Sequence, residues 1–414
     1  MAPFRLTAPC LFQFNLPTGT ILDACTPETL DAFRADLSIA EKEAFAAVVP
    51  KRASAQDGHW KTWEKFVSTF PGIDPYLTKL DRKHKLCFLQ VFATRLRRGI
   101  IAPGGKPVRG RTVEDYLRTV GSEIALVVDA GDPRNGDNGL HPSIDSLQRS
   151  YRKEDPPPER VKPVPIQLLF HAATAVALRS NPFLAAVLDL LIIGFFFLLR
   201  PGEHVYSNDN NHPFRLMDVS FQSPFGIYNA TTVTAAELAQ CTRVHLEFTT
   251  QKNQEKGEAI THGDTDDAIV SPFKAVARRV QHLRAHNAPG QTPLHTVFLP
   301  GGQTKCIRST DLTTMLRSSC KTIGAALGIT CKEISARALR AGGAMALLRA
   351  KVDDSTIRMM GRWKSWAMLR YLHRSATDTT TFARRMIPGG TFTIARHATL
   401  PADVHPSAPA DPLY

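Results

Sequence analysis

Cysteine is scarce in this sequence, and no spacing organises the few that are present. The 414 residues include seven cysteines, an odd number, with no C-x-x-C pair. No histidine lies at metal-ligand spacing from them. A disulfide framework and a zinc site are therefore both disfavoured, and the pattern favours a reducing compartment.

Long hydrophobic runs are equally rare. The longest extends from Phe183 to Leu199 and contains Asp189 and, near its middle, Gly194. About 20 apolar residues are needed to cross a bilayer, and a charge is costly inside one. We therefore expect this run to form a fully buried core helix, and we expect no membrane partner.

Acidic residues are outnumbered, with 38 Asp and Glu against 51 Lys and Arg and a formal net charge of +13. Between Lys51 and Arg111 there are 14 basic and four acidic residues, so this window carries +10 of that charge. A field of this kind attracts polyanions, of which nucleic acid is the commonest. The concentration of charge in one segment favours double-stranded DNA as the partner over a merely solvated basic face.

A proline-rich segment divides the chain. The twelve residues from Glu154 to Pro165, EDPPPERVKPVP, include five prolines, which neither a helix nor a central strand accommodates. Residues 154–165 are therefore predicted to link two domains, the number that this length suggests. The other predicted parts are an N-terminal extension (1–37), a helical domain (38–153), a second domain (166–388) and a flexible tail (389–414).

The apolar spacing predicts a mainly α fold with a small antiparallel sheet. Apolar residues recur at three and four positions from Ser38 to Arg152, and an aromatic stripe there, Trp60 to Phe66, is expected to be core. After the linker, Val244 to Phe248 alternates, and a second short strand around Ile260 follows the polar turn QKNQEKG, which predicts a hairpin. Helices are predicted near 166–178, 183–199, 271–286, 311–327, 336–350, 355–362 and 365–376.

Two arginines in the segment SARALRAGGAMALL suggest an anion site. Ser335 is a candidate N-cap, so that Arg337 and Arg340, three apart, would share a face in the first turn of a helix. Cations at that end oppose the helix dipole, and a bound phosphate would reverse the penalty. The adjacent Gly342-Gly343 predicts the close approach of a neighbouring backbone.

Two further segments complete the pattern. The sequence MGRWKSWAMLRYLHRS places Tyr371 on a short helix, 31 residues after Arg340. Upstream, GFFFLLRPGE places Arg200 before a proline, which favours the end of the buried helix at the arginine and the start of another after it. Glu203 is expected to orient the guanidinium of Arg200.

These segments, in this order, resemble the signature of the tyrosine recombinases, the phage-integrase-like superfamily. They are most similar to the branches in Crypton and DIRS-type mobile elements of eukaryotes, and the resemblance covers about residues 163–388. It implies a two-domain clamp on DNA, with the helical 38–153 region as the core-binding domain. It also implies self-association on DNA as a dimer or tetramer, in the nucleus of a eukaryote or otherwise in the cytoplasm.

The chemistry fits these residue types. A phosphodiester gains charge in a pentacoordinate transition state, for which the guanidinium forks of Arg200 and Arg340 are suited donors. The Tyr371 hydroxyl needs local positive charge to become a nucleophile. A lysine of the predicted hairpin, Lys252 by the resemblance or its rival Lys256, would protonate the leaving 5′ oxygen. A covalent 3′-phosphotyrosyl link conserves the bond energy, so no cofactor and no metal are implied.

The sequence departs from the family pattern at two places. Arg337 stands where most members have a histidine, and arginine cannot act as a base at neutral pH. The usual histidine or tryptophan before the nucleophile corresponds to Arg362, with Trp363 next to it, and either could bind the phosphate. These changes keep two other interpretations open, namely a DNA-binding protein that no longer cuts, and a type IB topoisomerase.

Overall fold

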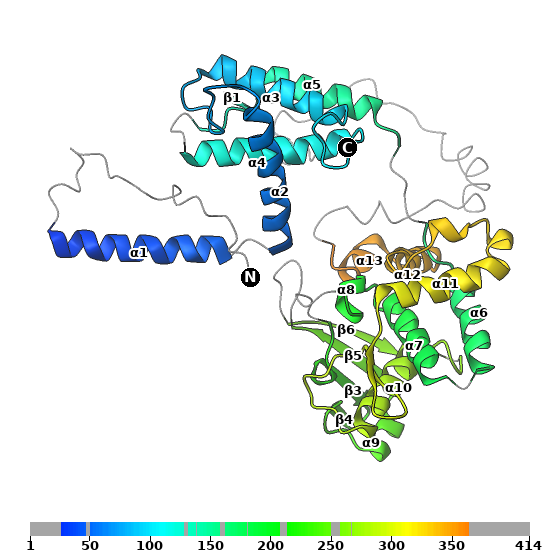
Figure 1. Cartoon of the computed structure of the whole chain (residues 1–414). Coiled ribbons are helices and arrows are strands. Elements are labelled where there is room, and N and C mark those ends of the chain that lie inside the picture. Colours follow the sequence, from blue (N-terminus) through cyan, green and yellow to red (C-terminus); the bar gives the residue numbers. More distant parts are fainter. Residues whose placement is uncertain are drawn as a thin grey trace, which may run out of the picture. The chain divides into compact units, whose positions relative to one another are not determined.

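The computed structural model describes residues 26–46, 50–127, 131–137, 139–157, 162–179, 181–207, 213–249, 257–265 and 267–363. Within these ranges the chain is mainly helical with small antiparallel sheets, which confirms the predicted fold class. The chain divides at residue 158 into two compact units, which are described separately (Figure 1). The helix predicted at 365–376 and the tail predicted from 389 lie outside the described residues.

The described N-terminal unit consists of helices and one short β-ribbon. The helical domain was expected to begin at Ser38, but the first helix begins at Pro27. The cause is the pair Thr26-Pro27, which forms a helix start. The Thr26 hydroxyl accepts a hydrogen bond from the amide of Thr29 at 3.3 Å, and proline is favoured in the first turn. The elements are α1 (Pro27–Ala46), α2 (Pro50–Val67), α3 (Arg82–Arg97), α4 (Gly110–Val127), β1 (Asn135–Gly136), β2 (Gly139–Leu140) and α5 (Pro142–Glu154).

Helices α2 to α5 enclose an aromatic core. Trp63 is fully buried, and its ring meets that of Phe92 edge to face, with 5.0 Å between centroids. The indole N–H of Trp63 donates to the carbonyl of Pro75 at 2.8 Å, so burial leaves its polar atom satisfied. Phe66 is also buried. The aromatic stripe of α2 is therefore core, as predicted.

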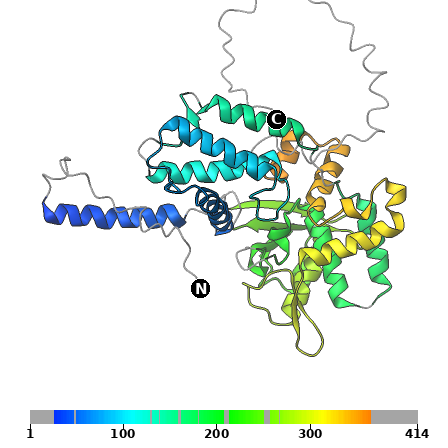
Figure 2. The ribbon, with the colours of Figure 1, turned by 45° about the horizontal axis from the view of Figure 1, so that its top comes forward.

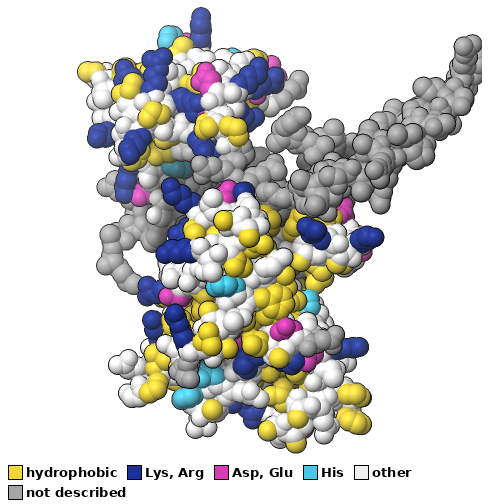
Figure 3. All heavy atoms as spheres, turned by 90° about the vertical axis from the view of Figure 1, so that its right-hand side faces the viewer, with side chains coloured by type: hydrophobic (Ala, Val, Ile, Leu, Met, Phe, Trp, Pro, Cys, Tyr) yellow, Lys and Arg dark blue, Asp and Glu magenta, His cyan; other side chains and the backbone are white. Residues whose placement is uncertain are grey.

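The cations of this unit lie mainly on its surface. Figure 3 shows Lys and Arg side chains spread over the visible face of the unit, with few acidic side chains among them. The exposed basic residues of α3, α4 and the connection between them are Arg82, Lys83, Arg98, Lys106, Arg109, Arg111 and Arg118.

The C-terminal unit is built around one almost entirely buried helix, α7 (Pro182–Phe196). Residues 186–195 are all buried, and the helix contacts α6, α10, α11 and α12. Its charged residue, Asp189, is paired with Arg278 at 2.6 Å. The prediction of a buried core helix is confirmed, and none of the described helices is long and apolar enough to cross a membrane.

The remaining helices of this unit agree with the predicted ones within a few residues, except for α9, which was not predicted. Helix α10 lies against the sheet, where it contacts β5 and β6 (Figure 2). The helices are α6 (Ile166–Ala177), α8 (Pro201–His204), α9 (Ala235–Gln240), α10 (Pro272–Ala285), α11 (Ser309–Ile323), α12 (Ala338–Arg349) and α13 (Asp354–Met360), with 3-10 turns at Leu216–Asp218, Ala325–Leu327 and Cys331–Glu333.

The main sheet is antiparallel, in the order β4-β3-β5-β6. The predicted hairpin is its β5–β6 pair, in which Phe248 lies opposite Glu258. Two more strands, which were not predicted from the sequence, extend the sheet. These are β3, in which buried and half-buried residues alternate, and the edge strand β4, which exposes Ile227. The strands are β3 (Val219–Ser223), β4 (Gly226–Asn229), β5 (Arg243–Phe248) and β6 (Glu258–Gly263), with a separate hairpin of β7 (Thr296–Phe298) and β8 (Thr304–Cys306).

Candidate active site

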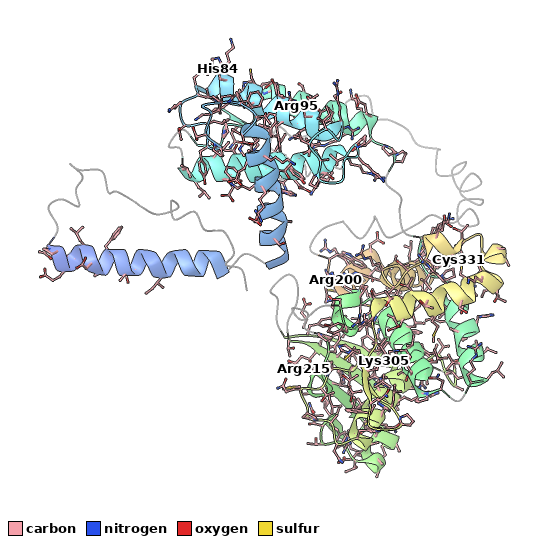
Figure 4. The ribbon with its side chains drawn as sticks, in the orientation of Figure 1. His84, Arg95, Arg200, Arg215, Lys305 and Cys331 are labelled. Carbon is pink, nitrogen blue, oxygen red and sulfur yellow. The ribbon has the colours of Figure 1, made fainter. Side chains whose placement is uncertain are left out.

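Arg200 lies in a tight link between α7 and α8 (Figure 4). Helix α7 ends four residues before Arg200, whereas the Arg-Pro pair predicted its end at the arginine. The cause is Leu198, whose left-handed backbone (φ 51°) lets the amide of Leu199 bond to the carbonyl of Gly194 at 3.0 Å. This is a Schellman-type helix end. Arg200 is then extended, and Pro201 opens α8 as expected.

Glu203 holds Arg200 from the first turn of α8. Its Oε1 accepts a hydrogen bond from Nη1 of Arg200 at 2.7 Å, and its Oε2 accepts one from the Arg200 amide at 2.8 Å. Oε2 also accepts from Nη2 of Arg362 at 2.9 Å. One carboxylate thus links two guanidinium groups. The side chain of Arg200 is 30% exposed and that of Arg362 is 1% exposed, so only Arg200 faces solvent.

Arg340, on α12, is buried next to the same link. Its Nη1 donates to the carbonyl of Leu198 at 3.0 Å, and its Nη2 donates to the carbonyl of Gly361. Its guanidinium also lies over the ring of Trp363, 4.4 Å from the centroid. These contacts connect α12 to the turn after α7 and to the turn after α13.

The two glycines of α12 allow this close packing. A Cβ on Gly342 would collide with the carbonyl oxygen of Val164, and one on Gly343 would collide with that of Phe195. The close backbone approach predicted from Gly342-Gly343 is confirmed. Since Phe195 belongs to α7, the contact fixes Arg340 relative to the turn that carries Arg200.

Arg337 does not share the environment of Arg340. It precedes α12, which begins at Ala338, and its side chain is exposed. The prediction of Ser335 as a side-chain cap, with both arginines in the first turn, is therefore wrong. Ser335 contributes only its carbonyl, which accepts from the amide of Ala338 at 2.8 Å. Arg337 is left at the surface.

Arg362 and Trp363 form the turn that ends α13. Arg362 has a left-handed backbone (φ 52°), and the amide of Trp363 bonds to the carbonyl of Arg358 at 3.0 Å, a second Schellman-type end. Gly361 is required because the indole of Trp363 occupies the place of a Cβ there. The Arg362 guanidinium lies over the ring of Phe248, 3.9 Å from its centroid.

Together these groups make what we call the arginine cluster: Arg200, Arg340, Arg362 and Glu203. Burial acts to raise the pKa of Glu203, but the positive charges of Arg362, Arg200 and Arg340 outweigh it. The pKa therefore lies below its ordinary value, and the carboxyl is ionised. Burial lowers the pKa of Arg362, which the charge of Glu203 opposes. The cluster thus combines three guanidinium groups with one carboxylate. A second carboxylate, Glu258, also raises the pKa of Arg362.

Three of the predicted residues, Tyr371, Lys252 and Lys256, lie outside the described residues. The described residues that flank the two lysines are Thr249 and Gly257, and Trp363 is the last described residue before Tyr371. Strand β5 ends on Phe248, which contacts Arg362 and precedes the segment with the lysines. Gly257 is the first described residue after the segment with the lysines, and its amide donates to the carbonyl of Phe248 at 3.0 Å.

Two parts of this arrangement, the Leu198 carbonyl and the ring of Phe248, could not be predicted from the sequence. The Leu198 carbonyl accepts from two arginines, Arg340 at 3.0 Å and Arg362 at 3.4 Å, and Phe248 supports one of them. Both contributions depend on tertiary contacts. In the described ranges, no group of three or more His, Cys, Asp or Glu side chains could hold a metal ion.

No protein-family model and no curated protein matches the sequence. Among solved structures, the chain is similar to a lambda integrase dimer bound to a COC′ core site, with 12% identity over 83% of this chain and 96% of that one and a TM-score of 0.45. It is also similar to the Tn1549 transposon integrase in complex with circular intermediate DNA (12% identity, 80% and 98% covered, TM-score 0.38). A third is the XerH site-specific recombinase bound to difH substrate (12% identity, 76% and 72% covered, TM-score 0.41).

Proposed function

We propose that this chain is a tyrosine recombinase, which cuts and rejoins DNA strands through a covalent 3′-phosphotyrosyl intermediate. The observation that carries the proposal is the convergence of three guanidinium groups, those of Arg200, Arg340 and Arg362, on Glu203, with the Arg200 side chain 30% exposed. Guanidinium groups gathered and held in this way favour the binding of an anion. A DNA phosphodiester is such an anion, and it gains negative charge in the transition state.

In the proposed reaction, Tyr371 Oη attacks the phosphorus, and the bond from phosphorus to the 5′ oxygen breaks. The phenol proton leaves to solvent or a nearby base, and Lys252, or its rival Lys256, donates a proton to the 5′ oxygen. Arg200, whose side chain is 30% exposed, donates to the pentacoordinate phosphorus, and the positive charge of the buried Arg340 stabilises the same transition state. A 5′ hydroxyl then attacks the phosphotyrosine, which restores the phosphodiester and frees the tyrosine. No bond energy is lost, so no nucleotide cofactor is consumed.

Arg337 has a more limited role in this proposal. It is exposed at the start of α12, from which a long side chain can reach a phosphate of bound DNA. It cannot take up the proton of the tyrosine, because a guanidinium stays charged. The partner is double-stranded DNA, on which the protein is proposed to self-associate.

The test is a search for the covalent intermediate. The protein is incubated with a pool of nicked duplexes, from which the short cleaved strand diffuses and traps the adduct. A denaturing gel is expected to show a protein–DNA adduct that is absent in Tyr371→Phe. Tyr228→Phe, a half-buried tyrosine on β4, is the matched control and should form it normally. An adduct that persists in Tyr371→Phe would remove this tyrosine from the reaction.

The replacement of the usual histidine by Arg337 specifically favours a second candidate, a DNA-binding protein that does not cut. Binding to the same duplexes with no adduct from any of them would establish it. Adduct formation together with relaxation of a supercoiled plasmid, but without joining of two DNA sites, would indicate the topoisomerase reaction instead.

A further inference from the structure

We propose that Arg362 and Trp363 are positioning residues that hold Arg200 and Arg340, and that neither contacts the DNA phosphate. The inference rests on the proposed function. It assigns a role to the turn of residues 361–363, where the sequence alone suggests a third phosphate contact.

The contacts of Arg362 point inward. Its Nη2 donates to Glu203 at 2.9 Å and also approaches the carbonyl of Leu198 at 3.4 Å. Its Nη1 lies 3.3 Å from the carbonyl of Met360 and 3.5 Å from that of Phe197. The ring of Phe248 covers one face of the guanidinium. The terminal nitrogens of this guanidinium are therefore directed at protein acceptors, and only 1% of the Arg362 side chain is exposed to solvent.

Through Glu203, Arg362 acts on Arg200. The two carboxylate oxygens are divided, with Oε1 on the Arg200 side chain and Oε2 on Arg362. Arg362 therefore fixes the rotamer of Glu203 and withdraws part of its negative charge from Arg200. Without Arg362, the carboxylate would neutralise Arg200 more completely, and the more exposed arginine would attract a phosphate less strongly.

Trp363 supports Arg340 in a different way. Its ring lies under the guanidinium at 4.4 Å, and the preceding carbonyl, that of Gly361, accepts from the same guanidinium. The ring restricts Arg340 to one plane, and a cation–π contact of this kind is also attractive. In this role the indole ring matters more than its N–H.

The backbone of the turn makes both contacts possible. The left-handed residue of a Schellman end is usually glycine, and here it is Arg362. A non-glycine residue is strained in that conformation, and the contacts of the Arg362 side chain offset this strain. Gly361 stands one position earlier, because Trp363 folds back over it.

The test measures the rate of adduct formation with protein in saturating excess over a nicked duplex. This rate does not depend on how much of the protein is folded, and melting temperatures are recorded alongside. Arg362→Met is expected to slow the reaction by about 10²-fold, as small misplacements in active sites do. The double variant Glu203→Gln/Arg362→Met removes both charges and should recover part of this loss. Arg349→Met, an exposed arginine at the far end of α12, is the control.

The tryptophan is tested with a matched pair of substitutions. Trp363→Phe keeps a ring under Arg340 and removes the N–H, so its rate should stay within about threefold of the wild type, the size of a modest change in a cation–π contact. Trp363→Ala removes both and should be much slower.

The outcomes separate the two proposals. If the double variant is slower than Arg362→Met, or if Trp363→Phe is as slow as Trp363→Ala, these residues contact the phosphate, and the inference is overturned while the proposed function stands. If the wild type forms no adduct, the proposed function fails first, and this inference fails with it.

Discussion

The two units of the chain hold their positive charge in opposite ways. In the N-terminal unit, the basic residues of α3 and α4 are mostly exposed around an aromatic core. In the C-terminal unit, Arg340 and Arg362 are buried and donate to the same carbonyl, that of Leu198, and Arg362 also donates to the carboxylate of Glu203. Exposed charges act over distance and are screened by salt, whereas buried charges act at short range in fixed directions. The comparison predicts that the first unit sets DNA affinity and the second sets the reaction rate.

The largest expected effect comes from Arg340→Ala. Removal of one preorganised donor typically costs about 2.7–4 kcal/mol in the transition state, so adduct formation should slow by about 10²–10³-fold. DNA affinity, measured by fluorescence anisotropy, should change little. A large loss of affinity with an unchanged rate at saturation would reverse the roles assigned to the two units.

Acid should affect the C-terminal unit more than the N-terminal one. Burial lowers the pKa of His204 and His295 to about 4, against an ordinary 6.5. Between pH 6.5 and about 4, these two rings bind protons in the unfolded chain but not in the folded one. The stability that is present above pH 6.5 is therefore lost as the pH falls toward 4. At pH 5 the loss for His204 is roughly 2 kcal/mol.

Two other groups bear on this prediction. Asp189, whose pKa burial raises to about 6, works in the opposite sense but offsets only part of the loss. In the N-terminal unit, burial also lowers the pKa of His59, but this residue is only half-buried. Hydrogen exchange at pH 7 and pH 5, corrected for intrinsic rates, should show a greater loss of protection in α7 than in α4. Equal losses would contradict the prediction.

Glycines of the two units should respond differently to an added methyl group. Gly343→Ala places a Cβ against the carbonyl of Phe195, and overpacking of this kind costs about 1–3 kcal/mol. Gly104→Ala, in the N-terminal unit, meets no atom within 4 Å and should be nearly neutral. Urea unfolding measures both. If Gly343→Ala proves as stable as Gly104→Ala, the contact between α12 and α7 is looser than described.

The smallest effects are expected from single exposed cations. Substitution of Lys106 or Arg111 by glutamine should weaken binding to every DNA sequence alike, and should reduce the slope of log affinity against log salt by about 1 if the residue contacts a phosphate. The rate at saturation should not change. A sequence-dependent loss would mean that the residue reads bases.

Some parts of the fold follow from local sequence, and others depend on tertiary contacts. Helix α7 could be predicted because its apolar run is continuous, and β5–β6 because its residues alternate. The turn at Leu198 could not, since a leucine with positive φ has no sequence signature. The separation of Arg337 from Arg340 was missed for a related reason, because the helix begins two residues later than the serine suggested.

The candidate site was predictable as a set of residue types but not as an arrangement. Spacing and resemblance selected Arg200, Glu203 and Arg340, and the structure brings these together. The inward direction of Arg362 depends on Glu203 and Phe248, which are 159 and 114 positions away in the chain. No local pattern records such a contact.

The distances in sequence across the arginine cluster have a consequence for biosynthesis. Arg340 bonds to a carbonyl 142 residues earlier, and Arg362 to a carboxylate 159 residues earlier. A nascent chain that has released α7 and α8 from the ribosome therefore holds Arg200 without the groups that surround it. The cluster assembles only when α12 and α13 have emerged and docked, so a shortened translation product that retains the basic N-terminal unit would bind DNA but lack the means to cut it.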